Sequence, residues 1–179
     1  MRCRWCNLEN DLYIKYHDSE WGVLNLDDHY LFEMLILESF QAGLSWECIL
    51  NKRDSFRKAY DNFDLDKVCS YTDDKILELM NNKEIVRNKL KIKASINNAC
   101  ILKKIIFEFG SFSNYLKEFW DGNIIYDSVS TTNELSDKIS FDLKKRGMSF
   151  VGSTIIYSFL QAIGIIYSHD KLCDLYRKR

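Results

Sequence analysis

The stretch from Leu12 to Trp46 decides how the rest of the chain is interpreted. It opens with LYIKYHDSEWG at residues 12–22 and closes with LESFQAGLSW at residues 37–46. Such dense alternation of aromatic side chains with a few ionisable groups is unusual for a plain helical core. It predicts a pocket for a flat ligand, with one carboxylate at the edge of the pocket.

Helical spacing places this carboxylate. Asp27 or Asp28 is suited to cap a helix whose apolar residues recur at i, i+3, i+4 and i+7. These apolar residues are Leu31, Met34 and Leu35. The next position of the stripe is Glu38, and the helix should end near residues 41–43. Ser45 then caps a second helix, so that Glu38 and Trp46 flank one tight turn. One side of this second helix holds Trp46, Ile49, Leu50, Arg53 and Phe56.

Length and composition restrict the class of protein. The 179 residues suffice for one compact domain over residues 1–179. With 46% hydrophobic and 28% charged residues the chain is neither disordered nor membranous, and no apolar run approaches the roughly 20 residues that span a bilayer. No secretory signal follows the first residues, so we expect a cytoplasmic protein whose six cysteines are thiols or ligands rather than disulfides. A net charge of −1 argues against nucleic-acid binding by charge alone, although a local basic face could serve.

The remaining apolar residues recur mostly at helical spacing, so the sequence predicts an all-α fold. Asp64 and Thr72 are suited to cap two short helices. A longer helix is expected from about residue 88 to residue 109, ending before Gly110. The start of this helix is basic and contains Arg87, Lys89, Lys91 and Lys93. Residues 123–132 are β-branched and polar without helical period, and we expect an ordered loop there.

A basic hairpin is predicted nearer the C-terminus. One helix should end at Gly147, a short turn should close at Gly152, and a second helix should start at Ser153. Glycine lets backbone amides approach a phosphate, and the N-terminus of the second helix adds partial positive charge. The candidate DNA-binding residues are Lys144, Lys145, Arg146, Gly147, Gly152 and Ser153. Such a unit can hold a nucleic-acid backbone without reading its sequence, although an ordinary helical hairpin is commoner for one such segment taken alone.

Four possible metal ligands lie near the two ends of the chain. His169 and Cys173 are one helical turn apart, and Cys3 and His17 lie near the N-terminus. A Cys2His2 set suits tetrahedral zinc, and four protein ligands would close the coordination shell and make the zinc structural. Spacing alone leaves two alternatives open: Cys6 could replace one cysteine, or His17 could be a core histidine beside free thiols. We interpret Cys48, Cys69 and Cys100 as buried small hydrophobic residues in helices.

Several motifs together resemble those of one known family. They are residues 2–6 (RCRWC), 12–22, 31–34 (LFEM), 37–38, 41–46, 144–152, 157–159 (YSF), 161–162 and 169–173 (HDKLC). In this order they are similar to the type I 3-methyladenine DNA glycosylases over essentially the whole chain. The similarity is weaker between residues 56 and 132.

The resemblance implies an all-α fold of the helix-hairpin-helix DNA glycosylase superfamily, with one structural Zn²⁺ that joins the two ends of the chain. The implied zinc ligands are Cys3, His17, His169 and Cys173. The implied base pocket contains Glu38 as the catalytic residue, with Tyr13, Tyr16, Trp21, Trp46 and Trp5 around it. Many members of the superfamily carry a catalytic Asp after the second hairpin helix. The first acid there is Asp170, between two implied zinc ligands, which agrees with the type I family because that family lacks the Asp.

The activity implied by the resemblance is hydrolytic, monofunctional excision of 3-methyladenine from alkylated double-stranded DNA by a monomer, which releases the free base. N3-methylation makes adenine cationic, so aromatic rings would attract it and Glu38 would accept hydrogen bonds from its edge. The competing interpretation of Glu38 is a buried acid neutralised by a Lys or Arg. Three other functions compete with excision: a non-catalytic lesion-binding protein of the same fold, a zinc-dependent hydrolase with an open metal position at His17 and His169, and a helical DNA-binding module.

Overall fold

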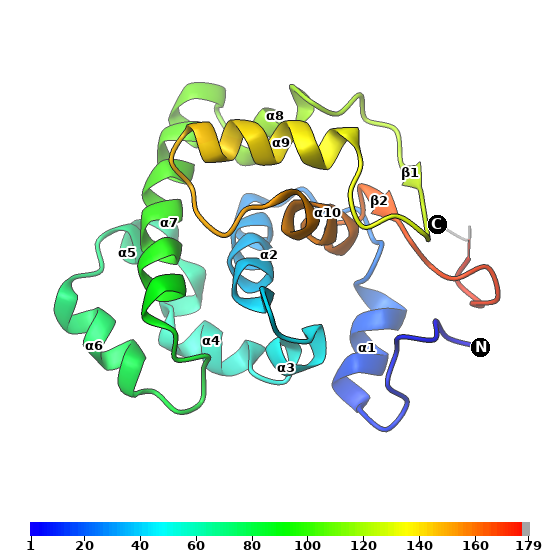
Figure 1. The fold of residues 1–179 in the computed structure, drawn as a ribbon, viewed down its shortest axis with the longest axis horizontal. Helices are drawn as coiled ribbons and strands as arrows, with labels where there is room; N and C mark the ends of the chain where they lie inside the picture. Colours follow the sequence, from blue (N-terminus) through cyan, green and yellow to red (C-terminus); the bar gives the residue numbers. More distant parts are fainter. Residues whose placement is uncertain (177–179) are drawn as a thin grey trace.

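Helix α2 (Asp28–Gln41) runs through the centre of the molecule, and α7 (Lys89–Phe109) is the longest of the described helices (Figure 1). The structure, a computed structural model, describes residues 1–176. The other elements are α1 (Asp11–Ser19), α3 (Trp46–Leu50), α4 (Arg53–Ala59), the 3-10 helix η1 (Asp61–Phe63), α5 (Leu65–Cys69), α6 (Asp73–Asn81), α8 (Phe112–Lys117), β1 (Ile125–Tyr126), α9 (Glu134–Lys145), α10 (Ser153–Ala162) and β2 (Ile166–Tyr167). The predicted, predominantly helical architecture is confirmed. Within residues 1–176, the helices lack either the length or the apolar character that crossing a membrane requires.

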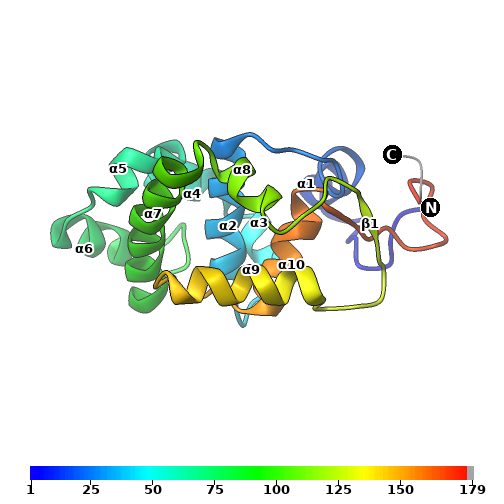
Figure 2. The ribbon, with the colours of Figure 1, turned by 90° about the horizontal axis from the view of Figure 1, so that it is seen from above.

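Helix α2 is enclosed on all sides, because every residue from position 31 to position 40 is buried. Of the two candidate caps, Asp27 is the N-cap, and its carboxylate accepts a hydrogen bond from the Tyr30 amide at 2.9 Å. The Asp28 carboxylate instead accepts hydrogen bonds from the Phe112 and Ser113 amides at the start of α8, both at 3.1 Å. Seen from above, α2 lies between α7 and α10 (Figure 2). A polar side chain on α2 must therefore find its partners inside the protein.

The segment after α2 differs from the single helix expected there. Ser45 is the N-cap of α3, as predicted, and its hydroxyl accepts a hydrogen bond from the Cys48 amide at 3.2 Å. The helix then breaks after Leu50, where the Lys52 amide donates to the Ile49 carbonyl at 3.0 Å in an i to i−3 turn. Residues 46–56 are consequently divided between α3 and α4.

Helix α7 has the predicted ends. The Asn88 side chain accepts hydrogen bonds from the Leu90 and Lys91 amides, and Gly110 closes the helix with a φ of 82°. Lys91 differs from Arg87, Lys89 and Lys93 at the basic start of this helix, because those three are exposed and Lys91 is only 7% exposed. Its ammonium group points into the protein and caps the end of α2, so it does not belong to the exposed basic face.

Two further expectations are wrong in part. Residues 123–132 are not entirely loop, because β1 pairs in parallel with β2, with Ile125 opposite Ile166 and Tyr126 opposite Tyr167. Cys69 and Cys100 are not free hydrophobic residues but form a disulfide between α5 and α7. The packing of α5 on α7 brings their Cα atoms to 4.9 Å, within the range that a disulfide requires. Cys48 is a free, half-buried thiol.

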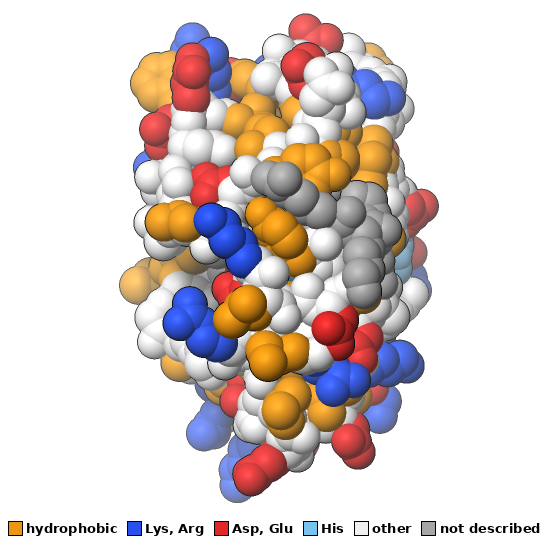
Figure 3. Space-filling view, turned by 90° about the vertical axis from the view of Figure 1, so that its right-hand side faces the viewer, with side chains coloured by type: hydrophobic (Ala, Val, Ile, Leu, Met, Phe, Trp, Pro, Cys, Tyr) orange, Lys and Arg blue, Asp and Glu red, His pale blue; other side chains and the backbone are white. Residues whose placement is uncertain are grey.

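Helices α9 and α10 form the predicted hairpin, and α10 starts at Ser153 as expected. The two helices pack on each other, and Met148 and Val151 of the connection are buried. The face that carries the two termini shows acidic and basic side chains interspersed with hydrophobic ones (Figure 3). This mixture agrees with the small net charge of the chain.

Candidate active site and metal centre

A cavity of about 250 Å³ lies where α1, α2, α3 and α10 meet the segments that follow β1 and β2. Its volume suits one small planar molecule. The described residues that line it are Trp5, Tyr13, Tyr16, Trp21, Glu38, Gln41, Trp46, Ser128, Ser130, Ser158, Gln161, Ser168 and Asp170. The structure thus brings together all six residues that the sequence suggested for a base pocket.

The aromatic residues form a nearly continuous wall of this cavity. The ring centroids of Tyr16 and Trp46 are 5.3 Å apart, and those of Trp5 and Trp21 are 5.1 Å apart in an edge-to-face arrangement. Tyr13 lies 5.4 Å from Trp5. These tilted contacts are the favoured geometry for aromatic pairs, so the rings support one another while their remaining faces border the cavity.

Glu38 is the acid of the cavity, and it has no partner of the kind that usually accompanies a buried carboxylate. The side chain is 2% exposed, and among the described residues Oε2 has no hydrogen-bond partner. Burial raises the pKa of Glu38 to about 8. Glu33, on the same helix, shows the contrast: its carboxylate is equally buried but is bonded by Arg53 at 2.6 Å and by Arg57 at 2.8 Å. Glu33, not Glu38, is therefore the buried acid that arginine side chains neutralise.

Three donors around Glu38 are also unsatisfied. The Tyr16 hydroxyl, the Trp21 Nε1 and the Trp46 Nε1 are buried and lack hydrogen-bond partners within residues 1–176. Buried polar atoms are nearly always hydrogen-bonded in folded proteins, so a cluster of four unpaired ones indicates that a ligand or water completes them. The site therefore presents three donors and one acceptor to a flat molecule that both accepts and donates hydrogen bonds.

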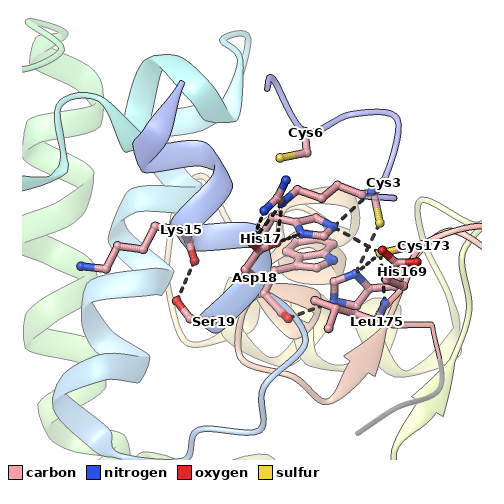
Figure 4. A network of polar contacts seen from close by, with 12 residues as sticks. Cys3, Cys6, Lys15, His17, Asp18, Ser19, His169, Cys173 and Leu175 are labelled. Atoms are coloured by element: carbon pink, nitrogen blue, oxygen red, sulfur yellow. Dashed lines mark hydrogen bonds and ion pairs between the residues drawn. The ribbon is translucent and has the colours of Figure 1, made fainter. Parts of the chain in front are cut away.

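A second cluster joins the N-terminal segment to the segment after β2. The ligand atoms of Cys3, His17, His169 and Cys173 lie within 4.8 Å of one another, and all four residues are buried. The Cys3 Sγ is 3.4 Å from the His169 Nδ1, and the Cys173 Sγ is 3.5 Å from both the His169 Nδ1 and the His17 Nε2. Figure 4 shows these side chains pointing toward one another. Such a group could hold a metal ion.

The other cysteine of the Cys-x-x-Cys motif lies outside this cluster. The Cys6 Sγ donates to the Tyr13 carbonyl at 3.8 Å, and Figure 4 shows it directed away from the other ligands. The structure thus selects Cys3 from the two candidates that spacing left open.

Both histidines of the cluster are fixed through their second ring nitrogen. The His17 Nδ1 lies 2.7 Å from the Asp18 carboxylate, which Arg2 holds with three hydrogen bonds of 2.7–3.0 Å. The His169 Nε2 lies 3.3 Å from the Trp21 carbonyl. The His17 Nε2, which also lies 3.2 Å from the Cys3 amide, and the His169 Nδ1 are the nitrogens directed into the cluster, the usual arrangement around metal-bound imidazoles. The Trp21 contact also connects the metal cluster to the wall of the cavity.

The family description with which the sequence agrees is methyladenine glycosylase, and the match covers residues 5–177. The chain belongs to this family. It is 38% identical over 181 residues to DNA-3-methyladenine glycosylase 1 of Escherichia coli (strain K12), a match that covers 98% of this chain and 96% of that protein. Among solved structures, 3-methyladenine DNA glycosylase I from Staphylococcus aureus is 33% identical, with a TM-score of 0.93 and 99% and 97% of the two chains covered. A Y16F variant of a 3-methyladenine DNA glycosylase I in complex with 3-methyladenine is 33% identical, with a TM-score of 0.91 and 97% and 96% covered.

The hairpin residues of this methyladenine glycosylase family member have two different environments. Lys144 and Lys145 are exposed at the end of α9. Arg146, in contrast, pairs with Glu108 and Asp142, at 2.7 Å in each case, and its guanidinium lies over the Phe109 ring. Its charge is therefore balanced inside the protein, so the two lysines provide the free positive charge of this turn.

The glycines and the serine of the hairpin are also placed. Gly147 has a φ of 100°, which favours glycine, whereas Gly152 has a φ of −62°. Ser153 directs its hydroxyl to the Ser136 hydroxyl at 2.9 Å and to the Asp137 carboxylate. Its side chain therefore joins α10 to α9, and the backbone amides at the start of α10 are the groups that face outward from this helix end.

Sequence reasoning missed the polar side of the cavity. Ser128 and Ser130 come from the segment between β1 and α9, which was expected to be only a loop, and Gln161 and Ser168 come from α10 and the end of β2. The Gln161 Nε2 donates to the Ser168 hydroxyl at 2.7 Å, and that hydroxyl donates to the Asp127 carbonyl. Only the pairing of β1 with β2 brings these residues together, and no local pattern in the sequence indicates that pairing.

Proposed function

We infer that this protein is a DNA-3-methyladenine glycosylase that excises the methylated base from alkylated DNA. Its membership of the methyladenine glycosylase family supports this function, and so do the names of its relatives. The observation that carries it is local: the buried Glu38 Oε2 and three donors around it have no hydrogen-bond partner among residues 1–176, and they border an aromatic cavity of about 250 Å³. That arrangement matches a flat, positively charged base better than a neutral one.

The proposed recognition step uses the charge of the lesion. A base must leave the duplex before its glycosidic bond can be cut, at a cost of a few kcal/mol that is lower for a damaged pair. N3-methylation gives adenine a positive charge, and rings such as Tyr16 and Trp46 attract a cation by roughly 0.5–2 kcal/mol. Glu38 would accept hydrogen bonds from the base edge, and its loss of a proton in the presence of the cation would favour the lesion over ordinary adenine.

The proposed chemical step is hydrolysis by water. Water attacks the sugar carbon as the bond to the base breaks, the bonding electrons neutralise the cationic base, and the proton of the attacking water passes to solvent or to a nearby acceptor. Free 3-methyladenine leaves as the product. A lyase reaction would need an amine nucleophile, and among the described residues that line the cavity there is no lysine. This supports a monofunctional enzyme, with Glu38 as the residue that stabilises the cationic base.

We propose that the Cys3, His17, His169 and Cys173 cluster binds one structural Zn²⁺. Zinc bonds of about 2.3 Å to sulfur and 2.0–2.1 Å to nitrogen place tetrahedral S and N ligands about 3.5 Å apart. Three of the S–N separations in the cluster, at 3.4–3.5 Å, agree with that value. Four protein ligands leave no position for a substrate, which argues against a zinc-dependent hydrolase. The ion would hold the terminal segments, and through His169 the Trp21 wall of the cavity.

The DNA contacts are proposed from the hairpin. Lys144 and Lys145 supply exposed positive charge, and the start of α10 at Gly152 and Ser153 supplies backbone amides for a phosphate. Arg146 and Gly147 are proposed to shape the turn beside these contacts. We propose that α9, this turn and α10 act as a helix-hairpin-helix unit, which holds a DNA backbone without reading bases. We also propose that residues 1–179 act as one domain and as a monomer on double-stranded DNA.

The direct test is a base-release assay. Purified protein is incubated with double-stranded DNA treated with a methylating agent, and the released bases are separated by chromatography. The proposal predicts release of 3-methyladenine with intact DNA strands until alkali is added. Binding of methylated DNA without base release would show a non-catalytic lesion-binding protein instead. Strand cleavage without alkali would contradict the monofunctional reaction.

A further inference from the structure

Two turns that border the proposed DNA-binding side are held by the same helix. The pocket turn (residues 42–45) connects α2 to α3 and leads directly into Trp46, and the hairpin turn (residues 146–152) connects α9 to α10. We propose that Lys91 and Asn98 of α7 are positioning residues that hold these two turns in the arrangement needed for base excision. The inference rests on the proposed glycosylase function, and it assigns a role to a buried lysine at the basic start of α7.

Lys91 acts at the C-terminal end of α2. It is 7% exposed, and its Nζ donates to the Phe40 carbonyl at 2.8 Å and to the Ala42 carbonyl at 2.5 Å. The last carbonyls of a helix have no partner within the helix, and a cation there also interacts favourably with the helix dipole. A buried ammonium group is costly without such partners. The two carbonyls therefore fix the position of the Lys91 ammonium group, and Lys91 in turn fixes the position of the two carbonyls.

The carbonyls that Lys91 holds stand between the acid and an indole of the cavity. Glu38 lies two residues before Phe40, and Trp46 lies four residues after Ala42. The chain leaves α2 at Ala42 and reverses through Gly43, which has a φ of 78°. The Leu44 amide donates to the Gln41 carbonyl at 2.6 Å within this turn, and Lys91 holds the turn to α7. Loss of the Lys91 anchor should therefore displace Trp46 relative to Tyr16.

Asn98 acts on the hairpin turn in a comparable way. Its side chain is completely buried and exchanges two hydrogen bonds with the backbone of Ser149: its Nδ2 donates to the carbonyl at 2.8 Å, and its Oδ1 accepts from the amide at 3.0 Å. The neighbouring Asn97 donates to the Gly147 carbonyl at 2.9 Å. Phe150 has a φ of 56°, a conformation that non-glycine residues adopt only where the surroundings hold it. The two asparagines provide that support.

The spacing of the two anchors explains why one helix can serve both turns. Lys91 and Asn98 are seven residues apart, two turns of a helix, so they lie on one face about 10.5 Å apart. A helix is rigid over this length. Figure 1 shows the hairpin turn, in orange, beside α7, and the pocket turn between α2 and α3. Helix α7 therefore fixes the separation between the turn that shapes the base cavity and the turn that is proposed to hold the DNA backbone.

The test compares Lys91→Met and Asn98→Leu with the wild type and with two controls. Lys103→Met makes the same change at an exposed α7 position, which pairs with Asp66 on α5. Leu79→Ala removes a fully buried side chain on α6 and so lowers stability away from both turns. Each protein is measured well below its own melting temperature, with helix content and metal content checked. The three readouts are affinity for free 3-methyladenine, affinity for DNA with an abasic analogue, and single-turnover release of 3-methyladenine.

Lys91→Met should weaken binding of the free base and slow its release from DNA, each by about tenfold, the effect of losing one charge-assisted hydrogen bond. Lys91→Arg, which keeps the charge and the donors, should recover part of both. Asn98→Leu should weaken DNA binding by a similar factor and leave free-base affinity unchanged. Both controls should match the wild type.

If Lys91 and Asn98 contributed only to folding, the binding and release measurements would differ from this expectation. Lys91→Met with wild-type base affinity and release rate, or Asn98→Leu with wild-type DNA affinity, would overturn the corresponding half of the inference. A reduction of the same size in Leu79→Ala would overturn both halves. A wild-type protein that releases no base would refute the proposed function instead, and the two failures are therefore distinguishable.

Discussion

Replacement of Glu38 by glutamine should make the protein more stable at pH 8 and change its stability little at pH 5. Burial raises the pKa of this carboxyl from 4.5 to about 8. The unfolded chain therefore loses the proton near pH 4.5, whereas the native protein keeps it until about pH 8. Between these values the unfolded state binds fewer protons, so the free energy of unfolding falls as the pH rises. Glutamine has the same shape and does not ionise, so the variant lacks this loss.

The size of the effect follows from the two pKa values. Each pH unit inside the window lowers the free energy of unfolding by up to about 1.36 kcal/mol. Allowing for partial ionisation at both ends, the change from pH 5 to pH 8 should cost the wild type about 3.5 kcal/mol relative to Glu38→Gln. This is a large fraction of the roughly 5–15 kcal/mol that stabilises a typical domain. For a chain of this length it corresponds to a difference in melting temperature of about 7–14 °C.

The measurement is urea-induced unfolding of both proteins at pH 5, 6, 7 and 8, at one salt and one zinc concentration, followed by circular dichroism. All other titrating groups, including the candidate metal ligands, are the same in the two proteins. Their difference in unfolding free energy therefore isolates Glu38. If this difference stays constant from pH 5 to pH 8, Glu38 ionises as an ordinary surface acid, and the reasoning from its burial and missing partner is refuted.

Three further predictions concern the pocket and the metal. Excision should accelerate as the pH rises from 7 to 8, because ionised Glu38 binds the cationic base, and a single-turnover rate that falls over this range would contradict that role. Trp46→Ala should weaken free 3-methyladenine binding by about 1–3 kcal/mol, the usual loss on removing a stacked ring, with unchanged helix content; unchanged binding by fluorescence titration would remove Trp46 from the pocket. Cys173→Ser should lose the metal, measured by elemental analysis, and should unfold at a lower temperature than the wild type. An unaltered melting temperature in a metal-free protein would exclude the structural role.

Local sequence signals predicted the ends of several elements correctly. Ser45 caps the helix that follows it, Asp27 is the cap of α2 among the two candidates, and Gly110 ends α7 with a positive φ. These signals succeed because a cap acts on amides two or three residues away, so the pattern and its effect lie in one short segment. The acid on the α2 stripe was visible for a similar reason: helical period alone places Glu38 among buried residues.

Contacts between distant segments could not be predicted in this way. Lys91 belongs to the basic start of a predicted helix, but its partners are carbonyls about 50 positions earlier in the chain. The disulfide between Cys69 and Cys100 depends on the packing of α5 against α7. In each case the residue type allows both outcomes, and only the tertiary arrangement decides between them. The position of Ser128 in the cavity depends in the same way on the pairing of β1 with β2.

The family resemblance decided between metal ligands that spacing left open. Spacing alone did not show whether Cys3 or Cys6 is the ligand, and the resemblance implied Cys3. The structure agrees, because Cys3 lies in one buried cluster with His17, His169 and Cys173. The resemblance did not reveal that Arg146 is paired within the protein, because a basic run gives no information about which of its charges meets an acid.

Single-turnover release of the base tests most directly whether Glu38, whose Oε2 is unpaired among residues 1–176, makes this protein a 3-methyladenine glycosylase. Wild type and Glu38→Gln are each incubated in excess over methylated double-stranded DNA at pH 8, and released 3-methyladenine is quantified by chromatography. The account predicts rapid release by the wild type and release at least about tenfold slower by Glu38→Gln, the loss expected from one hydrogen bond to a charged group. Equal release by the two proteins, or no release by either, would contradict it.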